Sequence, residues 1–418
     1  MELPRFSMGI GDRFGLQGQA QLKAFFRAKE LGVDITPVWN KSHREHTIIG
    51  THPDHVKLEA DEATKSMDWQ DAYFVDADHI SIHNVDLFMA SSSFFTIDIA
   101  ESIGQSSAGD SIAYFKNQLE PYLDSISQRS SKTSLILDTK TINRFSEKYL
   151  AAIQEAQIVY QQIKTKKGDA SSIIEVSLDE TAEPQSPEEI FLILAALALH
   201  KIPAQTIAPR FTGAFNKGVD YRGDCDRFAE EFEANLKMIQ LAVNLFDLPK
   251  NLKLSIHSGS DKFSIYGIMR DLVNKYNAGL HVKTAGTTWL EELIGLAISG
   301  NEGLSIAKNV YRASLERYDE LSSPYLSVLD INPANLPVAD QVQNWDGDYF
   351  ADCLRHDQTC PSYNPDIRQL LHIGYKVAAE MGDSFYSALK KNAGIIGEQV
   401  ETNIFERHMK RIFIQEET

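Results

Sequence analysis

The clearest structural signal in the chain is the run Leu252-Lys253-Leu254-Ser255-Ile256-His257, in which apolar and polar residues alternate. A segment with helical periodicity follows it, and a second run of the same kind, Leu280-His281-Val282-Lys283-Thr284, comes after that segment. The order of strand, helix and strand predicts a β-α-β unit with two parallel strands.

The same alternation repeats along the chain, and it predicts eight strands. They are Ser7–Gly11, Ile35–Trp39, Tyr73–Ala77, Ile173–Ser177, Gln205–Pro209, Lys253–His257, Leu280–Thr284 and Tyr325–Leu329. The predicted helices are Gln17–Leu31, Pro53–Met67, Pro187–His200, Asp224–Phe246, Lys262–Tyr276 and Thr288–Tyr318, the last one broken near Gly300–Gly303. Eight β-α units favour a closed (β/α)8 TIM-type barrel of the α/β class over an open doubly wound sheet, because no glycine-rich dinucleotide turn marks a crevice between strands.

Two regions interrupt this rhythm. Residues 90–170, between the third and fourth predicted strands, hold serine-rich stretches and a helical pattern from Thr141 to Lys166, which predicts a helical insertion or lid. After the eighth predicted strand, a proline-rich connection leads into further helices. We therefore predict a catalytic barrel domain at 1–330, which includes the insertion, and a helical C-terminal extension at 331–418 packed on the barrel.

Composition narrows the class of protein. The chain has 418 residues, of which 43% are hydrophobic and 24% charged, as in ordinary soluble globular proteins. Its formal net charge of −17 disfavours nucleic acid and anionic membranes as partners. No apolar run approaches the roughly 18 residues of a membrane span, and no secretory signal is evident. The three cysteines, Cys225, Cys353 and Cys360, form no Cys-x-x-Cys pair, so we expect a reducing, cytoplasmic location.

Strand parity predicts which side chains point into the barrel, where catalytic groups gather at the C-terminal ends of the strands. The aliphatic residues of each strand should face the helices. The polar residues that this leaves facing inward are Ser255, His257, His281, Lys283, Glu175, Ser177 and Asp179. In the third predicted strand, Asp76 and Asp78 share one face and His79 lies on the other.

Two imidazoles and a carboxylate that converge on one point would suit a divalent metal ion such as Zn, Mn, Co or Ni. We predict His257, His281, Glu175 and His79 as candidate ligands, with the choice between His79 and His281 as third ligand left open. The alternative is that each inward histidine is an ordinary core residue with a hydrogen-bond partner, since no compact motif such as His-Glu-x-x-His is present.

Cations near the predicted strand ends could hold an anionic substrate. The predicted substrate-binding residues are Lys41, Arg44, Arg210, Lys217, Asp220, Arg222 and Lys262. Arginine offers a planar two-pronged donor and lysine a point charge, so the set suits a carboxylate. The alternative is that these are solvated loop charges, paired with residues such as Asp220 and Asp224.

Other chemistries lack their motifs. Gly9-Ile10-Gly11-Asp12-Arg13-Phe14-Gly15 is similar to a dinucleotide-binding loop, but its third glycine falls one position late, so we interpret it as a tight turn. A Gly-x-Ser-x-Gly elbow and a phosphate-binding Gly-x-x-x-x-Gly-Lys-Ser/Thr loop are both absent from the sequence. Serine-nucleophile and nucleotide-driven reactions are thereby disfavoured.

The strand-end segments resemble those of the tagaturonate/fructuronate epimerases, metal-dependent enzymes of hexuronate catabolism. The segments that carry the likeness are Met8–Gly15, Pro37–Ser42, Arg44–Thr47, Tyr73–His79, Phe94–Asp98, Ala208–Gly213, Asn216–Tyr221, Ser255–Lys262 and His281–Thr287. Residues 110–170 and those after Leu329 carry little of it. The resemblance implies a barrel that binds a hexuronate or related keto sugar and interconverts D-tagaturonate and D-fructuronate at C4.

This reaction constrains the mechanism, because the C4 hydrogen is not adjacent to the C2 ketone and simple enolisation cannot invert it. Retro-aldol cleavage of C3–C4 followed by re-addition would do so, with a metal as Lewis acid. The candidate acid–base residues are Asp76, Asp78, Glu175 and Lys283, of which we assign Asp76, Asp78 and Lys283 as catalytic. A closed site would retain the detached fragment, which would give the 90–170 insertion a purpose.

Two other functions remain open at this stage. One is a metal-dependent aldose–ketose isomerase or C3 epimerase that uses the same ligands. The other is a sugar-acid-binding barrel without catalysis, which the combination of inward His257, His281, Glu175 and Lys283 disfavours. The metal's identity, the acceptance of neutral ketohexoses and the formation of a homo-oligomer are not determined by the sequence.

Overall fold

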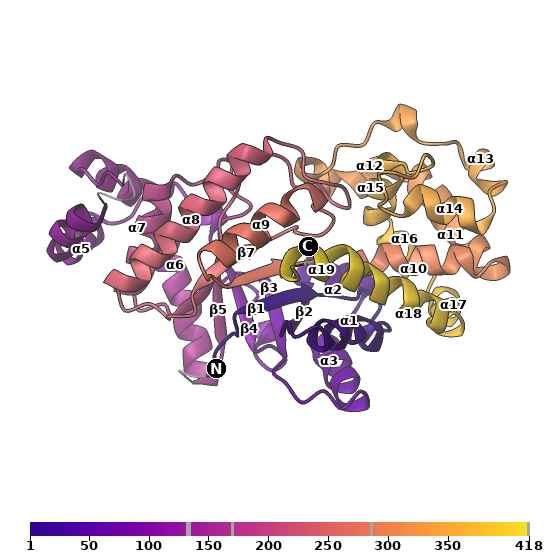
Figure 1. Ribbon diagram of the computed structural model, residues 1–418, viewed down its shortest axis with the longest axis horizontal. Helices are drawn as coiled ribbons and strands as arrows, with labels where there is room; N and C mark the ends of the chain where they lie inside the picture. Colours follow the sequence, from indigo (N-terminus) through magenta and orange to yellow (C-terminus); the bar gives the residue numbers. More distant parts are fainter. Residues whose placement is uncertain (131–134, 169–170, 285–286, 416–418) are drawn as a thin grey trace.

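The computed structural model describes residues 1–130, 135–168, 171–284 and 287–415. Eight parallel strands close into a barrel in chain order, with β8 pairing β1 (Figure 1). The strands are β1 Phe6–Ile10, β2 Thr36–Ser42, β3 Phe74–Ile80, β4 Phe94–Asp98, β5 Ile173–Ser177, β6 Ala204–Ala208, β7 Lys253–Ile256 and β8 Leu280–Lys283. The prediction of a (β/α)8 barrel is confirmed. Ala285 and Gly286, which belong to the last segment of the resemblance, lie outside the described residues.

The set of predicted strands needs two corrections, one omission and one false strand. The segment Phe94–Asp98 was not predicted, yet it is β4, whose Phe94 to Ile97 are fully buried between β3 and β5. The predicted strand Tyr325–Leu329 is instead part of a 3-10 helix, η2 Ser323–Val328, which begins with Pro324 in its first turn. Because β8 already pairs with β1, the closed sheet has no free edge for that segment. The predicted number of strands was right only because these two errors cancel.

The barrel helices follow the predicted periodicity closely. They are α1 Gly18–Glu30, α3 Asp54–Ser66, α6 Thr139–Lys167, α7 Pro187–Leu199, α8 Cys225–Leu245, α9 Phe263–Lys275 and α10 Thr287–Ile298. Side-chain caps explain several starts: Ser186 forms a capping box with Glu189, and Asp138 and Asp224 accept hydrogen bonds from the first backbone N–H groups of α6 and α8. The predicted break near Gly300 separates α10 from α11 Asn301–Glu316.

The helical insertion follows β4, so its predicted position directly after the third strand is wrong. Helix α6 packs on β4 and α7, as the barrel helix between β4 and β5 should. The additional helix α5 Gly109–Ser130 contacts α7 and α8, and it lies at one end of the molecule in Figure 1. Since α7 is apolar on all sides and almost completely buried, α5 serves to cover it.

The C-terminal helices pack on the other side of the barrel, around α10, α1 and α9. They are α12 Tyr318–Ser322, α13 Ala339–Gln343, α14 Gly347–Leu354, α15 Pro365–Ile373, α16 Tyr375–Glu380, α17 Asp383–Lys391, α18 Ala393–Thr402, the π-helix η4 Asn403–Met409 and α19 Lys410–Phe413. The remaining short elements are α2 His43–Ile49, α4 Val85–Phe88, η1 Ala100–Ser102 and η3 Pro333–Asn335. Helix α18 contacts both α10 and α1, which ties the end of the chain to its beginning.

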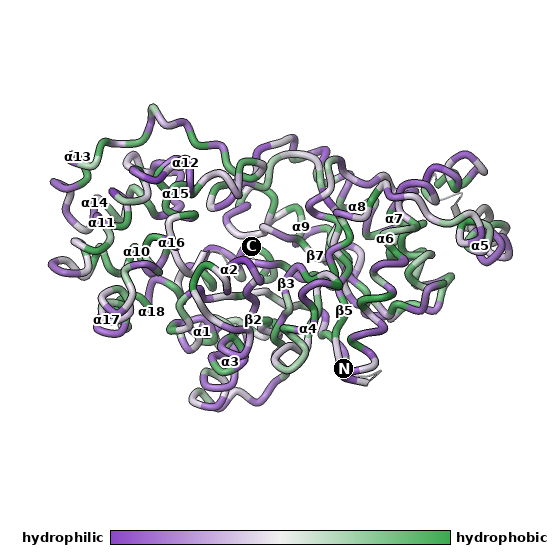
Figure 2. The backbone as a smooth tube through the Cα atoms, turned by 180° about the vertical axis from the view of Figure 1, so that it is seen from behind, coloured by the Kyte–Doolittle hydropathy of each residue, from purple (hydrophilic) through white to green (hydrophobic). Residues whose placement is uncertain are grey.

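The interior of the barrel changes from apolar to polar along its axis. A separate hydrophobic cluster of Leu3, Val38, Phe74, Phe94 and Ile173 fills the N-terminal end. The inward residues one step further along the strands are charged or polar, which places the chemistry at the C-terminal end. Figure 2 shows hydrophobic stretches running through the middle of the molecule and hydrophilic stretches along its outer helices and loops. No helix in the described ranges has the length and apolar character needed to span a bilayer.

Candidate active site

The C-terminal ends of the strands open into a cavity of about 1030 Å³. Strand ends and βα loops form its base, and segments beyond residue 323 form one side. Of the predicted catalytic and metal residues, Asp78, His79, His257 and Lys283 line this cavity. Asp76 and Glu175 are buried beneath it, at 2% and 0% exposure.

Lys283 is the centre of the polar layer. Its ammonium lies 2.8 Å from Asp76 Oδ2, 2.7 Å from Asp78 Oδ1 and 3.0 Å from Glu175 Oε1, and it donates to Thr96 Oγ1 at 2.6 Å. Thr96, on the unpredicted strand β4, donates in turn to Asp76 at 2.9 Å. Residues from β3, β4, β5 and β8 thus converge on one buried cation, which is how a barrel compensates inward charges.

The surroundings of Asp76 and Asp78 shift the pKa values of these two carboxyl groups in opposite directions. Burial opposes the charge on Lys283, but the three carboxylates outweigh it and raise the pKa of its ammonium well above the usual range. Burial raises the pKa of Asp76 to about 7 against the attraction of Lys283. Asp78 is also buried, but attraction by Lys283, His79 and His257 prevails and lowers its pKa to about 2. The side chain that faces the cavity is therefore the ionised one.

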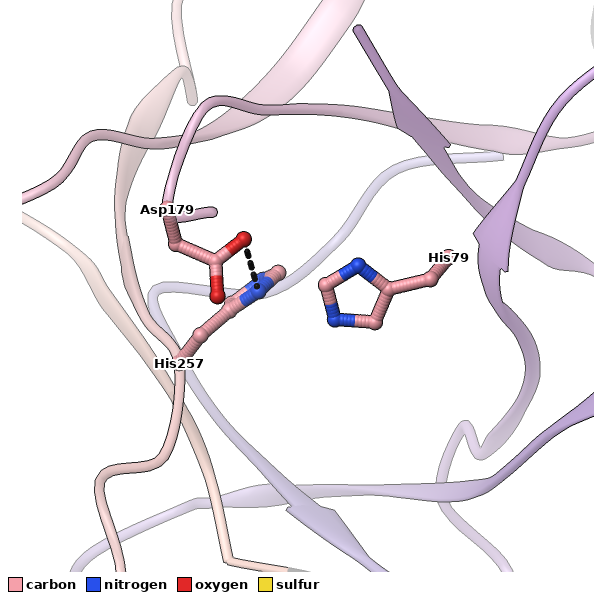
Figure 3. A group of neighbouring side chains, drawn as sticks. All are labelled: His79, Asp179 and His257. Atoms are coloured by element: carbon pink, nitrogen blue, oxygen red, sulfur yellow. Dashed lines mark ion pairs between the residues drawn. The ribbon is translucent and has the colours of Figure 1, made fainter. Parts of the chain in front are cut away.

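Three side chains beside this layer form a candidate metal site: His79, Asp179 and His257 offer ligand atoms that all lie within 4.8 Å of one another. Figure 3 shows the His79 ring facing the Asp179–His257 pair across a gap. The prediction that His79 lies on the opposite face from Asp78 is wrong. Its φ is +50° and the register of β3 shifts between Ala77 and Ile80, so the irregularity turns the ring into the site.

Hydrogen bonds orient these three ligand candidates. His257 Nε2 lies 2.7 Å from Glu175 Oε1, which leaves its Nδ1 facing Asp179 Oδ1 at 3.2 Å. His79 Nδ1 lies 3.0 Å from Asp98 Oδ2, and Ser177 donates to Asp179. Such supporting carboxylates and hydroxyls are typical of the residues behind metal ligands.

The donor set fits a divalent metal. Glu175 Oε2 is buried and, among the described residues, has no hydrogen-bond partner. Imidazole nitrogens with carboxylate oxygens suit Zn, Mn, Co or Ni. Without a metal, burial opposes protonation of both rings, yet the nearby carboxylates raise the pKa of His79 to about 10 and that of His257 to about 9. This excess of acidic groups is what a bound cation would balance.

His281 is not brought into this group. Its Nδ1 hydrogen-bonds Ser7 Oγ at 2.9 Å, its ring lies 5.3 Å from that of Phe94, and burial lowers its pKa to about 3. Strand β8 ends at Lys283, so His281 sits two residues deeper in the barrel. Inward parity alone does not tell how deep in the barrel an inward residue such as His257 or His281 lies. The third residue beside His79 and His257 is Asp179 and not His281.

The predicted substrate-binding residues divide into two sets. Arg44, Arg210, Lys217 and Lys262 line the cavity. The ammonium of Lys262 is occupied, however, because it donates to the backbone carbonyls of Asn216, Val219 and Ser260. Its role is to hold the β6 and β7 loops together.

The other three predicted substrate-binding residues do not line the cavity. Lys41 donates to the Arg13 carbonyl at 2.9 Å, on the far side of β2 from the inward Asn40. Asp220 accepts from the backbone N–H of Ser264 at 3.1 Å, near the start of α9. Arg222 is exposed and pairs with Asp330. Charge and loop position therefore predicted only part of this set.

Sequence reasoning missed the residues that reach the cavity from elsewhere. Arg13, in the β1 loop, pairs with Glu45 at 3.1 Å and lies over the ring of Tyr375. Tyr325, His372 and Tyr375 come from the C-terminal helices. The Tyr325 and Tyr375 hydroxyls lie 2.9 Å apart. No local pattern marks these positions. By contrast, the described part of 90–170 contributes only Asp98 and Glu101 to the lining.

Comparisons with known proteins agree with the resemblance. The model of a family described as UxaE, tagaturonate epimerase, matches residues 1–412. The tagaturonate/fructuronate epimerase of Thermotoga maritima is 27% identical over 423 residues, which cover 97% of this chain and 80% of that protein. Two crystal structures of fructuronate-tagaturonate epimerase UxaE from Cohnella laeviribosi match with a TM-score of 0.75, at 25% and 26% identity. They cover 99% and 98% of this chain and 82% of theirs.

Proposed function

The chain belongs to the tagaturonate epimerase family, and from this membership we propose that it interconverts D-tagaturonate and D-fructuronate by inverting the configuration at C4. The observation that carries the proposal is the pairing of a candidate metal site with an ammonium–carboxylate pair in one cavity: His79, Asp179 and His257 lie beside Asp78 and Lys283. A sugar-binding protein without catalysis would have little use for this combination.

We propose a divalent metal held by His79, Asp179 and His257. When bound, it would supply a Lewis acid that polarises the C2 carbonyl of the substrate. The convergence of the three side chains and the excess of carboxylates around His257 support this assignment. Glu175 and Asp98 would orient the two histidine rings from behind.

The proposed reaction begins at the C4 hydroxyl. The Asp78 carboxylate, which lines the cavity, takes the hydroxyl proton while the C3–C4 bond breaks. The bonding electrons pass to the C1–C3 fragment, which becomes an enediolate, and C4 becomes an aldehyde that keeps its hydrogen. After the aldehyde turns about C4–C5, C3 attacks its other face, the C3–C4 bond forms again, and Asp78 returns the proton to the C4 oxygen.

Lys283 supports this proton transfer from 2.7 Å away. Its charge stabilises the negative charge that passes through the C4 oxygen, and its other hydrogen bonds keep it fixed. Asp76 and Glu175, buried beneath the cavity, hold the ammonium in place and act as positioning residues. The prediction of Asp76, Asp78 and Lys283 as catalytic residues is thereby refined to Asp78 and Lys283 at the substrate.

The test uses the purified protein, its metal content and NMR. Incubation with D-fructuronate should yield D-tagaturonate, EDTA should stop the reaction, and added divalent metal should restore it. A product altered at C1, C2 or C3 would instead identify an aldose–ketose isomerase or C3 epimerase. Full activity in a metal-free protein would overturn the metal assignment and leave the epimerase assignment intact.

A further inference from the structure

Helix α15 presents two polar side chains of the C-terminal helices toward the barrel. Arg368 and His372 are four residues apart, so they lie on one face of the helix. Arg368 is fully buried and donates to the carbonyls of Gly218 at 2.6 Å and Leu354 at 2.7 Å, and to Asp261 Oδ1 at 2.9 Å. Since Gly218 and Asp261 belong to the β6 and β7 loops, Arg368 fixes this helix against the loops that border the cavity.

His372, one turn further along, lines the cavity itself. It is only 4% exposed, and its Nδ1 is buried without a hydrogen-bond partner in the part of the chain that the structure describes. The β6 loop approaches it closely at Gly218, where φ is +72° and a Cβ atom would lie 3.3 Å from Nδ1. Because Nδ1 lies against this loop, the other ring nitrogen, Nε2, is the one left for a molecule in the cavity.

The charges around His372 indicate what would bind there. Burial, with Arg13 and Lys217 nearby, lowers the pKa of His372 well below the usual range, so the ring is neutral and still carries one N–H donor. Arg13 is paired with Glu45. Lys217 donates to Ser258 Oγ at 3.2 Å and pairs with no carboxylate in the described ranges. An anion is the partner that complements these groups.

We propose that His372 and Lys217 bind the C6 carboxylate of the substrate and thereby make the enzyme specific for hexuronates over neutral ketohexoses. This inference rests on the proposed function and assigns the C-terminal helices a direct part in recognition. Lys217 lies on the β6 loop and contacts Ser258 on the β7 loop, so the carboxylate would lie against these loops while the reacting carbons lie over Asp78 and Lys283.

The test compares a charged and a neutral sugar on the full-length holoenzyme. D-Fructuronate is the substrate, and D-fructose, which lacks the carboxylate, is measured as a competitive inhibitor. We expect Lys217→Met and His372→Leu each to raise the KM for fructuronate at least about tenfold while the Ki for fructose changes less than about twofold. His372→Gln, which restores an N–H donor, should recover part of the loss.

A matched control is His356→Asn. His356 is a buried histidine in the loop between α14 and α15. It is bonded to Asp261 and absent from the cavity lining, so its replacement should leave the KM unchanged. An equal loss of affinity for fructuronate and fructose in both variants would overturn the carboxylate assignment. If His372→Leu does not fold, the Lys217→Met variant alone tests the proposal, because Lys217 lies on a loop. Calorimetric titration of fructuronate measures binding without turnover, so a failed epimerase assignment is distinguishable from a failed carboxylate site.

Discussion

The cavity has two regions of opposite character. The floor, defined by Asp76, Asp78, Glu175, His257 and Lys283, comes from strand ends and is rich in carboxylates. The wall, defined by Arg13, Lys217, Tyr325, His372 and Tyr375, comes from loops and C-terminal helices. It brings two cations, of which Arg13 is paired with Glu45, whereas Lys217 pairs with no carboxylate in the described ranges. The floor thus calls for a cation and the wall for an anion, which suits a keto sugar that chelates a metal at one end and carries a carboxylate at the other.

The largest expected effect is on the floor. Lys283→Met leaves three carboxylates without their shared cation, so epimerase activity should fall below detection and the free energy of unfolding should drop by about 3–5 kcal/mol. Activity assays and urea denaturation measure the two effects.

The matched control is Lys253→Met. Lys253 is a buried lysine of β7 whose ammonium donates to backbone carbonyls near the N-terminus, including that of Leu3 at 3.0 Å. Burial lowers its pKa to about 7, and its replacement should leave activity nearly unchanged. If Lys253→Met lost as much activity as Lys283→Met, the loss would not be specific to the floor and this part of the account would be wrong.

The next effect separates the two inward histidines. His257→Ala should lose bound metal and at least about a thousandfold in activity, because it removes a ligand of the proposed metal. His281→Asn should keep its metal, since His281 lies outside the candidate site and bonds Ser7. Metal analysis of the two purified variants decides the matter. Loss of metal in His281→Asn with retention in His257→Ala would reverse the assignment.

How much of this could be predicted from the sequence differs between the two regions. The floor depends on strand parity, a local property. Parity placed Glu175, His257 and Lys283 correctly on the inward face, and it put Asp76 and Asp78 on one shared face. It failed at His79 because a backbone irregularity reverses parity there. It also could not separate His281 from His257, because depth depends on the closed barrel rather than on the strand.

The wall depends on contacts between segments far apart in the chain. His372 meets Gly218, and Tyr325 forms part of a 3-10 segment that its β-like composition led us to predict as a strand. The run Phe94–Asp98 was missed for the converse reason, since serines surround it and its pairing partners are β3 and β5. In each of these segments, contacts with distant parts of the chain determine the secondary structure.

A third prediction concerns the attachment of the wall to the barrel. His408 Nδ1 hydrogen-bonds the Asn403 carbonyl, and its Nε2 accepts from the backbone N–H of Asp261 at 3.1 Å, so the folded ring must be neutral. Burial lowers its pKa from 6.5 to about 4. Between these values the unfolded chain binds a proton that the folded chain does not, so stability is full above pH 6.5 and falls as the pH is lowered toward 4.

The contribution of His408 to this loss is about 3 kcal/mol. Urea denaturation of the wild type and of His408→Gln between pH 4 and 7.5 isolates it, because the glutamine does not titrate. We expect the difference in unfolding free energy between the two proteins to be largest at pH 7 and to shrink as the pH falls. If the unfolding free energies of the two proteins changed with pH in parallel, protonation of His408 would have no effect on stability.

The smallest expected effect lies at the edge of the wall. Tyr325→Phe removes a hydroxyl that bonds the Tyr375 hydroxyl at 2.9 Å but leaves the ring in place. The loss of one partly exposed hydrogen bond should raise the KM for fructuronate about two- to fourfold, with no change in stability beyond about 1 kcal/mol. Steady-state kinetics check this value. A fall in kcat of a hundredfold or more would mean that Tyr325 belongs with the floor's chemistry.

The central claim is that the reaction breaks and re-forms C3–C4 on the floor while the wall holds the carboxylate. The most direct test is to run the epimerisation of D-fructuronate deuterated at C4 in ordinary water, and the unlabelled sugar in D2O. The account predicts that tagaturonate keeps its C4 deuterium in the first experiment and gains no carbon-bound deuterium in the second. Loss of the C4 label, or uptake of solvent deuterium at C3 or C4, would contradict it.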